Sequence, residues 1–259
     1  MASGMNRPKT PQETEAIRTS GKMLATVLDL IEKKLEPGMS GAYIDQMARD
    51  ELKRLGGKPA FLGVKGGYGV PDFPAVICIS VNDAVVHGIP DAEQFKVGDV
   101  VGFDFGVVYQ GMITDAARTF IVGGQPRSNA EKELVTLTKR SLDAGINAVK
   151  PGAKTGDIGY AVQSVLDTKN LGIIRELVGH GVGHELHEEP EVPNYGKKGT
   201  GAMLKEGMTI AIEPMATLGG WRVYMDRDMW TVRTMDGSVS AHFEDTILVT
   251  RDGAEILTR

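Results

Sequence analysis

The chain contains a single cysteine, Cys78, among its 259 residues. An internal disulfide is therefore impossible, which excludes the disulfide-stapled folds that are typical of small secreted proteins. The sequence also lacks an apolar run long enough to cross a membrane or to form the core of a signal peptide. These absences predict a cytoplasmic protein with no membrane partner.

Positive charge is scarce as well. The 29 Lys and Arg residues are outnumbered by 34 Asp and Glu residues, which gives a formal net charge of -5. Direct binding to nucleic acid depends on a basic surface, and no local basic patch is evident. We therefore expect no direct recognition of nucleic acid. Hydrophobic residues make up 41% of the chain, which is enough for a sizeable buried core.

Two amphipathic helices are predicted near the start of the chain. Thr10 and Glu13 have the spacing of a capping box, and the apolar stripe that follows them ends before Pro37. Ser40 can cap a second helix, which stops at Gly56. The chain thus starts with a helix pair.

Extended structure is predicted after these helices. Residues 63–74 are rich in Gly and Pro and are expected to be irregular. Residues 75–81 have the composition of a buried strand, and residues 85–90 continue the extended chain. Residues 99–122 then predict a hairpin with its turn near Gly111.

Two aspartates occupy the predicted hairpin. Asp104 and Asp115 lie at similar distances from the turn, so pairing makes them near neighbours on one face. In so acidic a chain this spacing also occurs by chance, and hairpin carboxylates usually face water. Asp104 differs because it interrupts an apolar run, where an unpaired charge is costly to bury. A cation, or a basic side chain such as Arg118, can compensate it.

The second half of the chain repeats the order of the first. Ser128 and Glu131 have the spacing of another capping box, and Thr155 can cap a further helix. Residues 96–104 then align without gaps with residues 205–213: each segment has a lysine, a glycine two positions later and an acid six positions after the glycine. Two copies indicate a duplicated helix-helix-strand-strand unit rather than a solenoid. The two acids that end these segments are expected near a pseudo-twofold axis.

A histidine cluster and two glutamates follow. Residues 178–190 contain three of the five histidines, and imidazole is a common ligand of transition metals. His184 and His187 are three positions apart, which excludes the H-E-x-x-H zinc motif. Polar loop histidines in water are the alternative. In the closing strand, residues 240–249, His242 and Glu244 share a face; this glutamate alone is equally compatible with a solvent-exposed strand end.

Taken together, these segments resemble type I methionine aminopeptidase, a bacterial-type member of metallopeptidase family M24. The resemblance covers almost the whole chain and implies an α/β (α+β) fold of the pita-bread type, with pseudo-twofold duplicated units around an antiparallel sheet. It implies a flexible N-terminal tip at residues 1–9 and a single catalytic domain at residues 10–259. The segments that carry it are Asp104 with Asp115, residues 179–183 with residues 187–190, residues 209–215, and residues 240–250.

The resemblance implies two divalent metal ions held by Asp104, Asp115, His180, Glu213 and Glu244. Clustered carboxylates repel one another and raise each other's pKa, whereas divalent cations neutralise them. In this family Asp115 and Glu244 bridge the ions, and Glu213 acts as general base for the bridging water that attacks the first peptide bond. The ligand types do not choose among cobalt, manganese, iron and zinc.

Other residues match the family's substrate site. His87 and His187 are implied to hydrogen-bond the peptide nitrogen side and to stabilise the oxyanion, respectively; a structural role beside the ligands is their alternative. Residues 66–73 form a segment that looks longer than in relatives. Phe61 and Val64 stand where relatives often have cysteine and an aromatic residue, and Leu186 also replaces a common aromatic. The implied methionine pocket comprises Cys78, Phe61, Val64, Leu186 and Trp230, although Cys78 and Trp230, without the resemblance, are more typical of an ordinary core.

The implied activity is removal of the initiator methionine from nascent proteins with a small second residue. The implied partners are nascent polypeptide N-termini and, as a further candidate, the ribosome surface, with the enzyme acting as a monomer. One alternative is a pita-bread peptidase that cleaves Xaa-Pro bonds, although its members usually carry a large additional N-terminal domain. The other is a catalytically inactive binding module, which would have lost the metal ligands.

Overall fold

Each half of the chain begins with a pair of helices. The structure is a computed structural model that describes residues 7–259. Both predicted capping boxes form: Thr10 with Glu13 at the start of α1, and Ser128 with Glu131 at the start of α3. The helices are α1 (Pro11–Lys34), α2 (Gly41–Leu55), α3 (Asn129–Asn147) and α4 (Thr155–Leu166).

The cap of α4 differs from the prediction by one residue. Thr155 is the first helical residue rather than the cap, and Lys154 occupies the cap position. The backbone N–H of Lys154 donates to the Asp157 carboxylate at 2.8 Å, so the acid in the first turn stabilises this helix start.

The strands pair in antiparallel fashion throughout. Their bounds, with two short 3-10 helices, are β1 (Lys58–Pro59), β2 (Ile77–Val81), β3 (Ala84–Val86), β4 (Val100–Tyr109), β5 (Met112–Ile121), η1 (Val122–Gly124), η2 (Asp167–Lys169), β6 (Gly172–Ile173), β7 (Gly179–Gly181), β8 (Glu188–Val192), β9 (Thr209–Ile212), β10 (Met215–Thr217), β11 (Val223–Met225), β12 (Val232–Thr234), β13 (Ser240–His242), β14 (Asp245–Thr250) and β15 (Gly253–Ile256).

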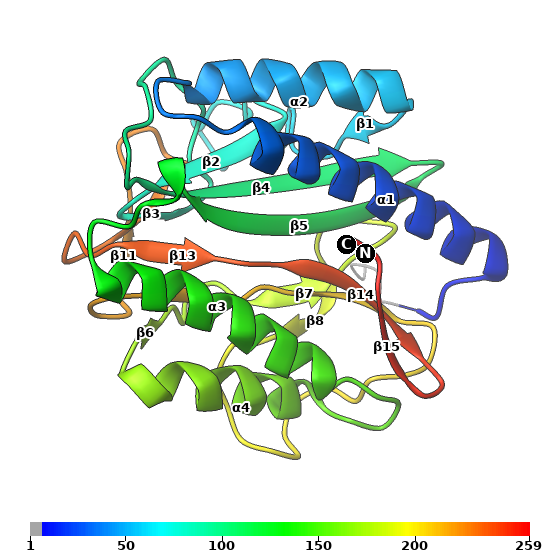
Figure 1. The fold of residues 1–259 in the computed structure, drawn as a ribbon. Helices are drawn as coiled ribbons and strands as arrows, with labels where there is room; N and C mark the ends of the chain where they lie inside the picture. The colour runs from blue at the N-terminus through cyan, green and yellow to red at the C-terminus, as the bar shows by residue number, and fades with distance from the viewer. Residues whose placement is uncertain (1–6) are drawn as a thin grey trace.

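The predicted duplication is present in the strand order. In the first half β4 lies between β2 and β5, and in the second half β9 lies between β7 and β14. Helices α1 and α2 lie beside the strands of the first half, and helices α3 and α4 lie beside the strands of the second half (Figure 1). Each half has its own apolar core, one around Leu24, Ile44 and Phe103 and the other around Leu142 and Ile158. No helix among residues 7–259 is long and apolar enough to span a membrane.

The β4–β5 hairpin places its two aspartates on one face. Asp104 pairs with Ala117, and Gly106 pairs with Asp115, so the two carboxylates are diagonal neighbours, offset by two residue pairs on the same face. Arg118 is opposite Phe103 and therefore points to the other face. The prediction that Arg118 compensates Asp104 is wrong, because one step along a strand reverses the direction of a side chain.

The two halves meet where β5 runs beside the last strands. Ala117 and Glu244 exchange two backbone hydrogen bonds, of 3.2 and 3.0 Å. Thr246 Oγ1 donates to the carbonyl of Asp115 at 2.7 Å and accepts from its N–H at 2.9 Å. The strand predicted over residues 240–249 is consequently interrupted around Glu244, because this residue pairs with Ala117 of β5, whereas β13 pairs with β10 and β14 pairs with β9 and β15.

The N-terminal segment is partly packed against the second half. Residues 1–6 of the predicted flexible tip lie outside the described residues, but residues 7–9 contact the body of the protein. The Lys9 backbone N–H donates to the Gly207 carbonyl at 2.8 Å, and its buried Nζ lies 3.3 Å from Glu188 Oε2. Glu188 Oε1 accepts from the N–H groups of His184 and Glu185 at 2.6 and 3.0 Å, so this ion pair supports the turn that carries His187.

The junction also contains a buried ion pair, which yields a stability prediction. Arg118 donates to the fully buried Asp245 at 2.8 Å and to the Glu244 carbonyl at 2.6 Å. We expect Arg118→Met to lower the free energy of unfolding by about 3 kcal/mol, because it leaves a buried carboxylate with Arg259 as its one remaining guanidinium partner. Urea denaturation of metal-free protein measures this change.

The matched control is Arg54→Met, which removes an exposed ion pair with Glu51. Exposed pairs contribute little, so this variant should unfold with the wild-type midpoint. Equal stability of the Arg118 and Arg54 variants would contradict the role given to the junction pair.

Candidate metal centre

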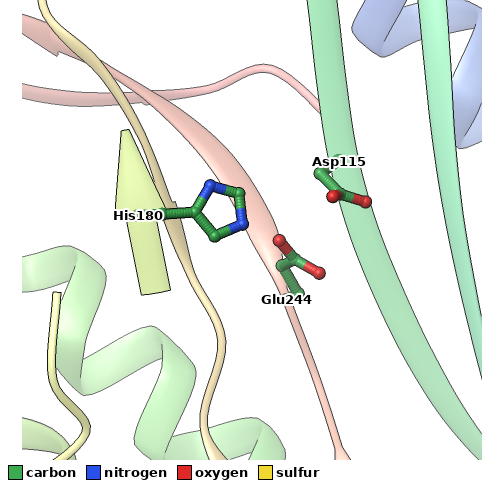
Figure 2. A group of neighbouring side chains, drawn as sticks. All are labelled: Asp115, His180 and Glu244. Carbon is green, nitrogen blue, oxygen red and sulfur yellow. The ribbon is translucent and has the colours of Figure 1, made fainter. Parts of the chain in front are cut away.

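Acidic and imidazole side chains converge at the junction of the two halves. Asp115 projects from β5, His180 from β7 and Glu244 from the segment between β13 and β14, and all three point toward one another (Figure 2). Each offers one ligand atom, and these atoms lie within 4.8 Å of one another. Glu213 and His242 form a second group of the same kind with Glu244. Residues from both halves therefore contribute to one centre.

The glycines around His180 allow its strand to approach β9 closely. A Cβ atom at Gly179 would lie 2.4 Å from the carbonyl oxygen of Ala211, so only glycine fits at this position. His180 Nδ1 lies 2.9 Å from the carbonyl of Gly181. Because a carbonyl only accepts, Nδ1 carries the proton and donates, which leaves Nε2 with a free lone pair. That Nε2 atom is 3.5 Å from Glu213 Oε1.

The carboxylates of the centre are buried at high electrostatic cost. Burial raises the pKa of Asp104, Glu213 and Glu244 well above its usual range, and the charges of neighbouring acids raise it further. Burial likewise raises the pKa of Asp115 to about 7. Without counter-charge these groups favour their protonated forms at neutral pH.

Several polar atoms of the centre lack hydrogen-bond partners. Among residues 7–259, six buried side-chain nitrogen or oxygen atoms have no partner, and four of the six belong to this cluster: Asp104 Oδ1, Asp115 Oδ1, His242 Nε2 and Glu244 Oε1. Burial lowers the pKa of both His180 and His242 to about 3, so both imidazoles are neutral. Unpaired carboxylate oxygens beside neutral imidazole nitrogens are a donor set that fits divalent transition-metal cations.

Two further histidines border the centre. Burial lowers the pKa of His87 to about 4, and it lowers the pKa of His187 as well. The His187 ring packs edge-on against His180, with 4.4 Å between ring centroids. His87 has a positive φ of 59°, which is uncommon for a residue with a side chain and indicates that its position is imposed by its surroundings. His184 lies apart from the centre, with its Nε2 2.8 Å from Glu13.

A cavity of about 380 Å³ opens onto these groups. It is lined by all the residues predicted for the methionine pocket and by all the predicted ligands and histidines: Phe61, Val64, Cys78, Leu186, Trp230, Asp104, Asp115, His180, Glu213, Glu244, His87 and His187. Cys78 is directly opposite Asp104 in the β2–β4 pair, so the apolar wall and the acid cluster are continuous. Burial raises the pKa of the Cys78 thiol, which is therefore neutral and apolar in character.

Sequence reasoning missed one wall of this cavity. Phe73 is 3% exposed, and its ring meets Trp230 edge-on with 5.2 Å between centroids. Trp230 Nε1 donates to the Pro71 carbonyl at 3.0 Å, which ties the irregular segment to the opposite wall. An aromatic residue at the end of a Gly- and Pro-rich segment was the available signal. His242 was also missed as a member of the centre, although it was expected to share a face with Glu244.

Metal-dependent hydrolases hold their catalytic cations with such buried carboxylates and neutral imidazoles, next to a cavity that accepts the substrate. Residues 15–251 match the model of metallopeptidase family M24. The chain belongs to this family, and within it to the methionine aminopeptidases.

Relatives and solved structures support this assignment. The chain is 40% identical to the methionine aminopeptidase of Clostridium perfringens over 250 residues, which is 96% of this chain and 97% of the relative. The crystal structure of methionine aminopeptidase from Thermotoga maritima is 46% identical and superimposes with a TM-score of 0.93, covering 98% of this chain and all of that one. The prolidase of Pyrococcus furiosus, 22% identical with a TM-score of 0.77 over 98% of this chain and 66% of its own, shares the pita-bread fold.

The raised carboxylate pKa values predict how metal-free protein responds to pH. Above about pH 7.5, one unit above the ordinary histidine pKa of 6.5, the histidines are essentially neutral in the folded and the unfolded state, so the carboxylates dominate the pH dependence. The folded state retains protons that the unfolded state has lost, so stability falls as pH rises through the folded pKa, about 7 for Asp115. Below about pH 7.5 the histidines of the unfolded state take up protons that the buried histidines do not, so they act in the opposite direction.

The melting temperature of chelator-treated protein should therefore decrease as the pH rises above about 7.5. Added Mn²⁺ or Co²⁺ should reduce this decrease, because the cations replace the protons as counter-charge. A flat profile in the chelated protein would show that the acids of the centre are ionised and stabilised without metal.

Proposed function

We propose that this protein is a metal-dependent aminopeptidase that removes the N-terminal methionine from polypeptides whose second residue is small. The observation that carries the proposal is the continuity between the acid cluster and an apolar cavity, seen in the pairing of Cys78 with Asp104. The side chain of methionine is a flexible, unbranched thioether, and it suits a cavity lined by aromatic and aliphatic side chains. With the methionine side chain in this cavity, the first peptide bond of the substrate would lie next to the carboxylates of the centre.

The proposed centre holds two divalent cations, with cobalt, manganese, iron and zinc as candidates. The proposed ligands are Asp104, Asp115, His180, Glu213 and Glu244. When bound, such cations acidify water and polarise the substrate carbonyl. The unpaired oxygens of Asp104, Asp115 and Glu244 support this ligand set.

The protein's own groups supply proton transfer and orientation. Glu213 directly follows the C-terminal end of β9. We propose that it accepts a proton from the attacking water and returns it to the leaving amine. His87 and His187 border the same cavity and are neutral, so each has one N–H to donate. In the proposed mechanism His87 orients the peptide nitrogen side and His187 stabilises the developing oxyanion.

The same proposal includes the cellular setting. The substrates are N-termini of nascent polypeptides in the cytoplasm, the ribosome surface is a candidate contact, and the enzyme acts as a monomer. Nothing in the proposed chemistry requires nucleic acid or a membrane.

A panel of peptides tests the substrate assignment. Metal-loaded protein should release methionine from Met-Ala and Met-Gly peptides, and it should act far more slowly on peptides that begin with Leu-Ala, because leucine is shorter and stiffer than methionine and fills less of the cavity lined by Phe61 and Trp230. Free methionine is quantified by chromatography with Mn²⁺, Co²⁺, Fe²⁺ and Zn²⁺ in turn. Cleavage of Ala-Pro peptides with no methionine release would instead assign an Xaa-Pro peptidase.

Glu213→Gln tests the proposed base. The amide cannot accept a proton at neutral pH, so kcat should fall by a factor of about 100 or more. Glu133→Gln, on the exposed face of α3, is the matched control and should retain wild-type kinetics. Metal content is measured in parallel, and a fully loaded Glu213→Gln enzyme with near-normal kcat would remove Glu213 from proton transfer.

A further inference from the structure

A buried lysine lies just before α1. The side chain of Lys9 is fully buried, and its Nζ atom lies 3.3 Å from Oε2 of Glu188, whose side chain is 3% exposed. Burial lowers the pKa of Lys9, and the charge of Glu188 opposes that change. Removing two charges from water is costly, and a buried ion pair is weak evidence for stability alone. The pair therefore needs a further physical explanation.

The second oxygen of Glu188 binds the turn that carries His187. Oε1 accepts from the backbone N–H groups of His184 and Glu185, at 2.6 and 3.0 Å. These N–H groups belong to the turn between β7 and β8, and His187 lies between them and Glu188 in the chain. The carboxylate therefore closes the turn that presents His187 to the cavity.

The aliphatic part of the lysine contacts the start of the same turn. A Cβ atom at Gly183 would lie 2.5 Å from Lys9 Cε, so the lysine packs directly against the backbone there. The carbonyl of Gly183 accepts from the N–H of Ile113 at 2.7 Å, which joins the turn to β5. The backbone N–H of Lys9 donates to the Gly207 carbonyl at 2.8 Å, which anchors the lysine itself. Lys9 and the turn are consequently held in a fixed relative position.

We propose that Lys9 is a positioning residue for His187 and acts through the Glu188 carboxylate. His187 lines the cavity, whereas Lys9 and Glu188 do not. The His187 ring packs edge-on against His180, with 4.4 Å between ring centroids, so movement of the turn displaces it from the centre. A displacement of about 1 Å is enough to lower a rate about 100-fold. This role rests on the proposed function, in which His187 stabilises the oxyanion.

Removal of the lysine charge leaves Glu188 buried without its ammonium partner. The ring of His184 lies 3.6 Å from Glu188 Oε1, which is beyond hydrogen-bond distance. An unpaired buried carboxylate takes up a proton or moves toward water, and either change weakens its hydrogen bonds to the two N–H groups. The turn then gains freedom, and His187 spends less time in the position that the oxyanion requires.

Lys9→Met tests this role in the Mn²⁺-loaded full-length protein. With a Met-Ala peptide, kcat should fall about 10-fold and KM should stay within about twofold, because a transition-state contact is displaced while the cavity lining is intact. Lys169→Met, which removes a lysine from an exposed pair with Glu133, is the matched control and should retain wild-type kinetics. Bound Mn²⁺ is measured in parallel, and a loss of kcat that follows a loss of metal would overturn the proposal.

A double-mutant cycle separates positioning from a general structural effect. In a His187→Ala background, Lys9→Met should change kcat by less than about twofold, since the group that it positions is already absent. An equal loss of kcat in both backgrounds would contradict action through His187.

Lys9→Met combined with Glu188→Gln keeps the proposal testable where the single variant folds poorly. The glutamine oxygen still accepts from the N–H groups of His184 and Glu185, and no buried charge is left unpaired. This double variant should have a kcat within about threefold of wild type, because the turn keeps its acceptor. A kcat as low as that of His187→Ala would overturn the proposal.

Hydrogen exchange gives a readout that needs no substrate. In Lys9→Met the amides of His184 and Glu185 should exchange at least about 10-fold faster than in wild type, whereas the amides of α3 should be unchanged. Unchanged exchange at these two amides would overturn the role of Lys9, and methionine release by the wild type would still support the proposed activity. Faster exchange together with failure of the methionine panel would instead overturn the activity and leave the placement of the turn intact.

Discussion

The burial of four carboxylates at one point is the constraint on which the rest of this structure depends. Asp104, Asp115, Glu213 and Glu244 all have pKa values raised by burial. The guanidinium of Arg118, the closest in sequence to two of them, is bonded to Asp245 instead. Neutralisation must then come from protons or from bound cations, and the neutral imidazoles beside the acids favour cations.

This constraint couples the centre to the association of the two halves. Asp104 and Asp115 belong to the β4–β5 hairpin, whereas His180 and Glu213 belong to β7 and to the end of β9. The halves are joined by the Ala117–Glu244 bridge and by the hydroxyl of Thr246 at Asp115. A cation held by residues of both halves would therefore stabilise the state in which the halves are packed together, because separating the halves would move its ligands apart.

Segments outside the duplicated core complete the substrate side. The irregular residues 63–74 bring Phe73 onto Trp230, and the Lys9–Glu188 pair supports the turn that carries His187. These contacts link residues about 160 to 180 positions apart in the chain. Substitutions in such segments can alter substrate preference without touching a ligand, because they shape the wall that the substrate side chain meets.

Much of the local structure was predictable because its causes are local. The capping boxes at Thr10 and Ser128 and the β4–β5 turn depend on residues a few positions apart, and all three are present. The matching segments that end in Asp104 and Glu213 predicted the duplicated fold. Errors appeared where a shift of one residue changes the outcome: Thr155 was one residue from the true cap, and Arg118, offered beside a cation as a partner for Asp104, points to the other face of the hairpin.

The sequence by itself thus determined the elements, the duplicated order and the ligand types. Only the tertiary structure decided which side chains share space across the junction, because the pairing of β5 with Glu244 links positions 127 residues apart, from Ala117 to Glu244. That pairing interrupts a strand that local pattern predicts as continuous, and it places His242 beside Glu213. Periodicity assigns a side chain to a face, whereas packing between distant segments decides what lies opposite that face.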